Sequence, residues 1–205
     1  NNAAWYLSLA GKRLDRAQEW AESAVVSTAA RLRSVVPETI GESNVTMARS
    51  LVSYWDTLGW VHFQRRDFEG AEPYLMAAIA LFPQREIAEH HAQLTAGRAW
   101  VAPPSSVSLS GVTLTRPTAC ADPCSAGFFV ALASTGKVSA VKFATGDPAL
   151  DPGGKSLVGL GHDLRFPDTM PTQVVVPATL ACPSSGDFHV AIGPRSTGWS
   201  PSASP

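Results

Sequence analysis

Few residues of this chain have types and spacing that could support chemistry, and the first candidate is the segment 149–156 (ALDPGGKS). It satisfies a loose phosphate-loop pattern, in which backbone amides cradle a phosphate and a lysine reaches its oxygens. Pro152 removes one of those amides because proline has no N–H. The sequence also offers no clear acidic residue at the end of an apolar strand to hold magnesium. We therefore expect a solvated turn rather than a nucleotide site.

The histidines are not spaced as a ligand set. His90 and His91 are adjacent, so on a helix their side chains point about 100° apart and cannot both bind one metal ion. His62, His162 and His189 are isolated in the sequence. No nucleophile-elbow, zinc-protease or haem-attachment motif occurs either. The sequence predicts no enzyme activity, no cofactor and no metal site.

Two of the three cysteines flank a short turn. Cys120 and Cys124 stand on either side of three residues between two strand candidates, so a disulfide closing this hairpin would be geometrically reasonable. Such a bond would indicate an oxidising compartment. The alternatives are two unpaired thiols, or competition from Cys182 for either partner. Three cysteines without a conveniently spaced fourth ligand make a poor tetrahedral zinc set.

The elements that must position these residues begin with a helical repeat at residues 55–83. Its spacing is carried by Trp55, Leu58, Gly59, Ala71, Leu75, Ala78 and Pro83. The small members let two antiparallel helices approach, the large ones fill the gap between them, and the proline ends the second helix. This pattern resembles the tetratricopeptide repeat, with His62 where an aromatic residue is usual and Leu75 where Phe is usual. The resemblance implies stacked all-α hairpins, because one repeat cannot bury its own apolar face.

Degraded neighbours are expected on both sides of this repeat. Residues 2–24 are expected to form the end of one helix and most of a second, and residues 87–98 the opening helix of a third repeat. Ala17 and Ala71 lie further apart than the repeat period of about 34 residues, so we expect an insertion near residues 31–49. It contains the turn formers and possible cap Pro37, Gly41, Ser43 and Asn44. The chain starts without Met and inside a predicted helix, which suggests a piece of a longer array.

Composition divides the chain into two domains and excludes two classes of partner. A net charge of −1 argues against a nucleic-acid-binding face, and no apolar run is long enough for a transmembrane helix. Charged residues become scarce after about residue 100, whereas Pro, Ser, Thr and Val increase. The predicted organisation is a helical domain at 1–98, a Pro/Ser linker at 99–106, a sheet domain at 107–192 and a Ser/Pro tail at 193–205.

The second domain reads as a small α+β unit. Alternating or apolar strand candidates occur at 107–110, 112–115, 128–132, 138–143, 174–176 and 188–192. Residues 134–137 (STGK) predict a hairpin turn between two of them, and residues 150–164 predict one short helix despite their glycines. The sheet must bury one face against that helix.

Residues 127–180 carry a second resemblance. The motifs are FV at 129–130, TGKVSAVKF at 135–143, GDPALD at 146–151 and LRFP at 164–167. They look like the carboxy-terminal domain of the TonB energy-transducer family, which implies a hairpin, a corner, a helix and a further strand. Leu164 stands where that family usually has Trp, the helix is rich in glycine, and no membrane anchor or long Pro-rich spacer precedes the domain. The resemblance implies the fold more strongly than it implies energy coupling.

The resemblance to repeat proteins also implies a partner-binding face. The residues of the first helix that are not used in contacts within the repeat include Ser53, Asp56, Trp60, Phe63 and Gln64. In repeat proteins this set lines the concave side, where peptides or partner helices dock. Trp60 and Phe63 are typical anchors for a partner. The alternative is that the insertion or a flanking repeat covers them.

Together these patterns predict a non-enzymatic scaffold or assembly protein of the bacterial periplasm or extracellular space. Its partners would be proteins, through self-association or as a subunit of a larger cell-envelope or extracellular complex, held by the concave helical face and an exposed strand edge. One alternative is the accessory C-terminal part of an exported enzyme whose catalytic domain lies upstream. Another is a ligand-binding module that uses a pocket between the two domains.

Overall fold

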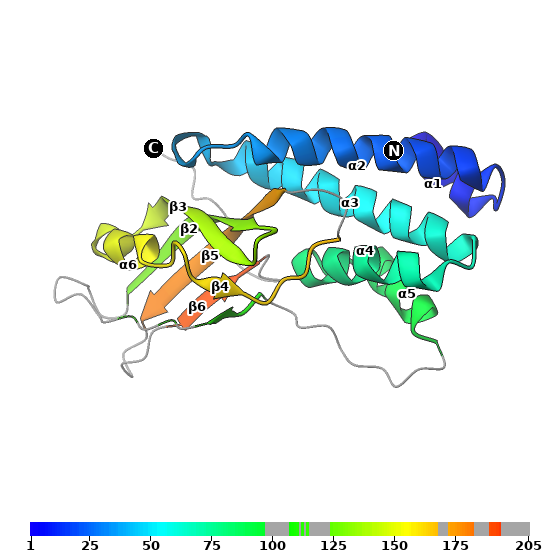
Figure 1. Ribbon diagram of the computed structural model, residues 1–205. Helices are drawn as coiled ribbons and strands as arrows, with labels where there is room; N and C mark the ends of the chain where they lie inside the picture. Colours follow the sequence, from blue (N-terminus) through cyan, green and yellow to red (C-terminus); the bar gives the residue numbers. More distant parts are fainter. Residues whose placement is uncertain are drawn as a thin grey trace.

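A computed structural model shows a layer of helices followed in the chain by an antiparallel sheet (Figure 1). It describes residues 1–96, 107–110, 112, 114, 124–167, 172–182 and 189–193. The predicted linker 99–106 and all of the tail 193–205 except Gly193 lie outside these ranges. The helices of the first part are α1 (Asn2–Leu9), α2 (Leu14–Arg33), the 3-10 helix η1 (Pro37–Thr39), α3 (Glu42–Gln64), α4 (Phe68–Leu81) and α5 (Arg85–Leu94).

The predicted hairpin at 55–83 is confirmed as helices α3 and α4. A Cβ placed on Gly59 would come within 2.8 Å of Leu75 Cγ, so only glycine allows this helix separation. Ala71 and Ala78 are fully buried at the same contact. Asp67 caps α4 by accepting a hydrogen bond from the Gly70 amide. The alternation of large and small residues therefore lets α3 and α4 pack closely, as the sequence predicts.

The other helices stack around α3, which contacts α1, α2, α4 and α5. The His90 ring of α5 packs against two tryptophans. Its centroid lies 4.3 Å from the ring centroid of Trp60 of α3 and 5.3 Å from that of Trp5 of α1. His90 Nδ1 also makes a buried 2.8 Å contact with Asp56 Oδ1. These aromatic and polar contacts join α1, α3 and α5.

The predicted insertion at 31–49 is mostly helical. Helix α2 continues to Arg33 and α3 already begins at Glu42, so only η1 and a few flanking residues form a turn. Asn44 Oδ1 accepts a hydrogen bond from the Gly41 amide at the start of α3, as expected of a cap. The insertion thus includes the adjoining ends of the two longest helices of the described chain.

The sheet has six described strands in the order β1-β4-β3-β2-β5-β6, and every neighbouring pair is antiparallel. The predicted turn at 134–137 is confirmed: Gly136 has φ +77° and donates its amide to the Ala133 carbonyl. Val107 forms a bridge with Ile192, so the two edges of the sheet meet at one point. The strands are β1 (Leu109–Ser110), β2 (Cys124–Ala133), β3 (Lys137–Gly146), β4 (Gly161–His162), β5 (Gln173–Cys182) and β6 (His189–Ile192).

Strand β2 is buried on both faces, which explains its unbroken apolar run. Phe128, Val130 and Leu132 belong to the main core, whereas Phe129 and Ala131 face a second cluster that includes Ile40 and Val45. The insertion therefore covers the sheet face that the short helix leaves open. That face could not have been assigned from the sheet sequence alone.

The predicted helix at 150–164 is much shorter than expected. It comprises η2 (Pro148–Leu150) and α6 (Asp151–Lys155), followed by turns and then β4. A Cβ on Gly154 would overlap the Phe128 ring, so the glycine lets α6 lie directly on the sheet. Close packing accounts for a glycine that helix propensity alone would disfavour.

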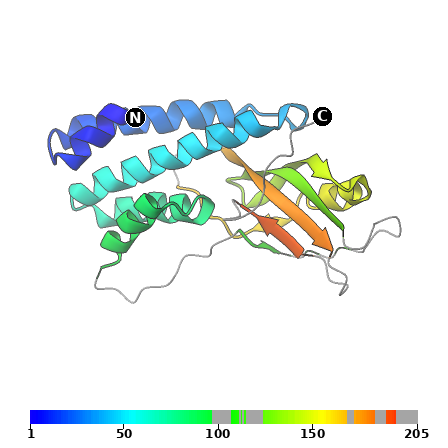
Figure 2. The same ribbon diagram turned by 180° about the vertical axis from the view of Figure 1, so that it is seen from behind.

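The helical layer and the sheet are joined by specific contacts. Gln173 Nε2, at the start of β5, donates to the carbonyls of Leu32 and Val35 at 3.0 and 2.8 Å. Figures 1 and 2 show β5 beginning beside α2 and α3 and running away from them. Trp55 of α3 contacts Phe166 edge-to-face, with ring centroids 5.9 Å apart. One core cluster includes residues of both parts, so the described helices and sheet form a continuous interior.

Candidate binding groove between the helices and the sheet

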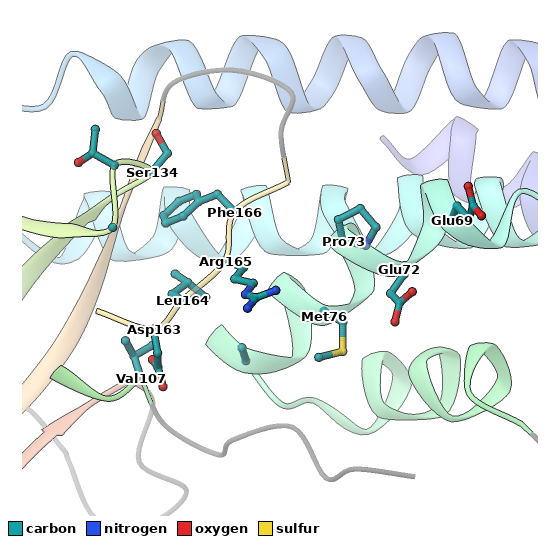
Figure 3. A pocket seen from close by; sticks show the side chains of 13 residues that line it. Glu69, Glu72, Pro73, Met76, Val107, Ser134, Asp163, Leu164, Arg165 and Phe166 are labelled. Carbon is teal, nitrogen blue, oxygen red and sulfur yellow. The ribbon is translucent and has the colours of Figure 1, made fainter. Parts of the chain in front are cut away.

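A groove of about 820 Å³ lies between α4 and the connection from β4 to β5 (Figure 3). One wall comes from the exposed face of α4, the other from residues 163–166, and the β2–β3 turn closes one end. The walls and floor include Glu69, Glu72 and Met76 of α4, and Asp163, Leu164, Arg165 and Phe166 of the connection.

The apolar floor of the groove is held from both sides. Phe166 is positioned by the buried Trp55 ring, and Leu164 is itself buried. Met76 is partly exposed, and its sulfur lies 2.9 Å from Nε2 of the buried His91. Because a thioether can only accept, this ring nitrogen carries the proton. Burial lowers the pKa of His91, and the nearby Glu72 partly opposes that shift, so the neutral ring is favoured beside the methionine.

The rim carries three acidic side chains and one basic one. Glu69, Asp163 and Arg165 are exposed, and Asp163 Oδ1 accepts a hydrogen bond from the Ser108 amide at 2.9 Å. Within the described ranges, no hydrogen bond or ion pair engages the Arg165 guanidinium. In Figure 3 Arg165 extends from the connection toward α4. The groove thus combines an apolar floor with an acidic α4 wall and a second wall that carries both Asp163 and Arg165.

Two polar residues near the groove, His162 and Ser134, hydrogen-bond with the backbone. His162, on β4, donates from Nε2 to the Ala133 carbonyl at 2.9 Å, and its Nδ1 is buried without a partner in the described structure. Burial lowers the pKa of His162, while its backbone contacts oppose the shift. Ser134 Oγ accepts a hydrogen bond from the Thr172 amide. His162 and Ser134 are therefore each engaged with a backbone group.

The predicted partner-binding face is partly wrong. Trp60 is only 6% exposed and stacks on both Phe63 and His90, and Asp56 is buried against His90. Helix α5 therefore covers these side chains, which was the alternative left open by the sequence. Phe63 and Gln64 are half-buried and Ser53 is exposed, so a partner role for these three remains a prediction.

The groove residues were missed at the sequence level, although part of their signal was present. Glu69, Glu72 and Met76 recur at helical spacing on the side of α4 that the repeat does not use. An outward methionine next to acidic residues is a weak indication of a binding face. Nothing in the local sequence shows that residues 163–166 form the opposite wall, because that contact depends on the tertiary fold.

The strand register brings Cys124 opposite Cys182. Cys120 lies outside the described residues, so the predicted Cys120–Cys124 hairpin bond stays a prediction. Cys124 opens β2 and Cys182 ends β5, and the register places these two buried residues directly opposite one another. Opposed residues of antiparallel strands have Cα atoms about 4.5–5.5 Å apart, a separation that disulfides accept. The register thus strengthens Cys182 as the competing partner of Cys124.

The phosphate-loop segment is a short helix packed on the sheet, so the expectation of a solvated turn is wrong. The amides of Ser156 and Leu157 donate to the carbonyls of Pro152 and Gly154, within the same turn of chain. Lys155 Nζ forms an ion pair with Asp151 Oδ2 at 2.6 Å. Backbone groups and lysine both have local partners here, which differs from an open phosphate cradle.

No protein-family model, curated protein or solved structure matches the chain. Among the described residues, no group of three or more His, Cys, Asp or Glu side chains could hold a metal ion. The helices of the described part include none with the length and apolar character needed to cross a bilayer. The geometry of the groove is therefore the main guide to function.

Proposed function

We propose that the protein is a non-enzymatic module that binds a polypeptide segment in the groove beside α4. The observation that carries this proposal is the apolar floor formed by Met76, Leu164 and Phe166, with exposed acidic side chains and Arg165 on the walls beside it. A peptide offers apolar side chains for such a floor and charged groups for Glu69 and Arg165. The walls belong to parts that share one core, so the groove is formed before a partner arrives.

The finer assignments made from the sequence support the same function. We assign the helices to the tetratricopeptide class because of the spacing from Trp55 to Pro83, and the sheet to the TonB-like class because of residues 127–180. Both resemblances favour an assembly role in the bacterial periplasm or outside the cell. An accessory role beside an upstream catalytic domain would use the same groove, and the full-length gene would distinguish that arrangement from a stand-alone scaffold.

A small apolar ligand is a second candidate for the same groove. The volume of about 820 Å³ lies within the roughly 300–1,000 Å³ typical of small-molecule sites. However, the exposed charges on both walls suit an occupant that also carries charges along its length. We therefore rank a peptide first.

A random peptide display library panned on the purified protein tests this function. Peptides enriched on the wild type should lose at least tenfold in affinity for the Met76→Lys and Arg165→Glu variants. The matched control is Val158→Lys, which changes an exposed apolar residue that does not line the groove. Enriched peptides that bind all variants equally would contradict the proposal. So would a library of small apolar molecules that raises the melting temperature when no peptide is enriched.

A further inference from the structure

A second exposed apolar surface lies on the other side of the helical layer, on α1 and α2. Tyr6, Leu9 and Trp20 are 70%, 55% and 39% exposed. Tyr6 and Trp20 line a depression of about 420 Å³ together with Ala3, Leu7, Arg13 and Arg16. We call Tyr6, Leu9 and Trp20 with this depression the α1–α2 patch. Large apolar side chains gathered in this way mark an interaction site.

Helix α1 is apolar in nearly every direction. Its buried residues, Ala4 and Ser8, face the other helices, whereas Tyr6 and Leu9 are directed outward. A helix with apolar side chains all round is normally covered on all sides. The described chain covers α1 on the side that contacts α2 and α3 and, through Trp5 and His90, α5, whereas Tyr6 and Leu9 stay exposed.

The rim of the α1–α2 patch is basic. Lys12, Arg13 and Arg16 are exposed there, and the Arg16 guanidinium lies 5.2 Å from the centre of the Trp20 ring. Two acidic residues, Asp15 and Glu19, lie nearby, but Asp15 is already paired with Arg65 of α3. Cations therefore predominate around the patch, so its occupant should present acidic side chains next to an apolar surface.

The groove beside α4 has the complementary character. Glu69 and Asp163 outnumber Arg165 on its rim, and its floor is apolar. Phe68, beside Glu69, is a further exposed apolar residue on the same helix. In Figures 1 and 2, α1 and α4 lie on opposite sides of α3. The patch and the groove are thus separate surfaces, and one copy could use both at once.

From this complementarity we propose that the α1–α2 patch of one copy docks into the groove of a second copy. Tyr6 and Trp20 would cover Met76 and the apolar floor, and the basic rim would face Glu69 and its acidic neighbours. The proposal rests on the proposed function, because it names a second copy as the occupant of the groove. Because the two surfaces differ, the contact is heterologous and continues from copy to copy as a ring or filament.

Two half-blocked variants test the contact. The patch variant, Tyr6→Glu with Trp20→Glu, keeps its groove; the groove variant, Glu69→Lys with Met76→Lys, keeps its patch. In sedimentation velocity the wild type should form species larger than a dimer as concentration rises, and each variant alone should be monomeric. An equimolar mixture should form a 1:1 dimer and nothing larger, because only one intact interface remains. The controls Val26→Glu and Val158→Lys, on other exposed surfaces, should assemble like the wild type.

A charge exchange keeps the test decisive if the groove variant is poorly folded. Arg16→Glu and Glu69→Lys should each weaken assembly at least tenfold. Mixing these two variants should restore assembly beyond a dimer, because the exchanged charges attract each other and the unchanged patch of one variant still fits the unchanged groove of the other. Assembly should also weaken as salt is raised, because exposed charges contribute to the contact. A wild type that stays monomeric up to millimolar concentration overturns this proposal. If display peptides still bind the groove, the proposed function survives that result; if they do not, both fail.

Discussion

The α3–α4 hairpin and the sheet both bury apolar residues, but their contacts are made over different distances in the chain. In the hairpin, Gly59 meets Leu75 and Asp67 caps the helix that follows it. In the sheet, the second face of β2 is covered by Ile40 and Val45, which belong to the helical part. The hairpin is therefore specified locally, whereas the sheet needs the helices to complete its core.

The largest expected effect is at Trp55, which belongs to both regions. This ring is 2% exposed and contacts Phe166 of the sheet part, so Trp55→Ala should cost about 3–5 kcal/mol of unfolding free energy. Urea unfolding followed by helical circular dichroism and by a probe in the sheet should show one joint transition, shifted to lower denaturant. Tyr6→Ala, at a site that is 70% exposed, is the control and should change stability little. Two separated transitions in the wild type would contradict the shared core.

Gly154 and Gly59 each permit a close contact, the first in the sheet part and the second in the α3–α4 hairpin. A Cβ on Gly154 would overlap Phe128, a core residue of the sheet, so Gly154→Ala should cost about 1–3 kcal/mol through overpacking. Gly59→Ala would place its Cβ 2.8 Å from Leu75 Cγ and also gains helix propensity, so its net cost should be smaller. Thermal melts of both variants give the order. Gly41→Ala, with no atom near its added Cβ, should differ little from the wild type.

The next effect concerns the hydrogen bonds that connect the regions. Gln173→Ala removes both donations to the end of α2, and should cost about 1–2 kcal/mol for two neutral hydrogen bonds. Ser139→Ala is the matched control, since it removes the bond to Gln173 Oε1 but leaves the two interface bonds in place. Equal denaturation midpoints for Gln173→Ala and Ser139→Ala would show that these bonds do not stabilise the joint.

These differences explain which features could be predicted from the sequence. The hairpin α3–α4 and the turn at Gly136 depend on residues close in the chain, and both were predicted. The length of α6 was not predicted, because the need for glycine at position 154 comes from its contact with Phe128, which is distant in the sequence. Residues 31–49 were expected to contain turns and a helix cap, but most of them are helical, and their contact with the sheet is not visible locally.

The candidate site shows the same limit. Trp60 and Phe63 were selected because they lie together on one face of a helix, which is correct, but α5 and α1 cover Trp60 through His90. Periodicity indicates which residues share a face, whereas the identity of whatever covers that face depends on the stacking of other helices. The groove was missed because its walls come from distant segments.

Stability should also depend on pH in both regions. Burial lowers the pKa of His91 in the helices and of His162 in the sheet below the ordinary 6.5. The folded state then binds fewer protons than the unfolded state, so stability falls as pH drops through 6.5 and toward the lower folded values. Denaturation midpoints between about pH 8 and pH 5 measure this fall. His91→Gln and His162→Gln should each flatten it, and a wild type that gains stability on acidification would contradict the sign.

The smallest effect is expected at Lys155, one residue from the sensitive Gly154. Its ammonium pairs with Asp151 on the surface of α6, and exposed pairs of this spacing contribute about 0.3–0.5 kcal/mol. Lys155→Ala should therefore melt within a degree or two of the wild type, and neither protein should hydrolyse ATP with magnesium. Asp151→Ala is the matched control, because it breaks the same pair from its other end. Magnesium-dependent ATP turnover in the wild type that disappears in Lys155→Ala would show that α6 serves a ligand as well as the sheet. Without such turnover, a large loss of stability in Gly154→Ala beside a small one in Lys155→Ala would show that packing on Phe128 determines the conformation of α6.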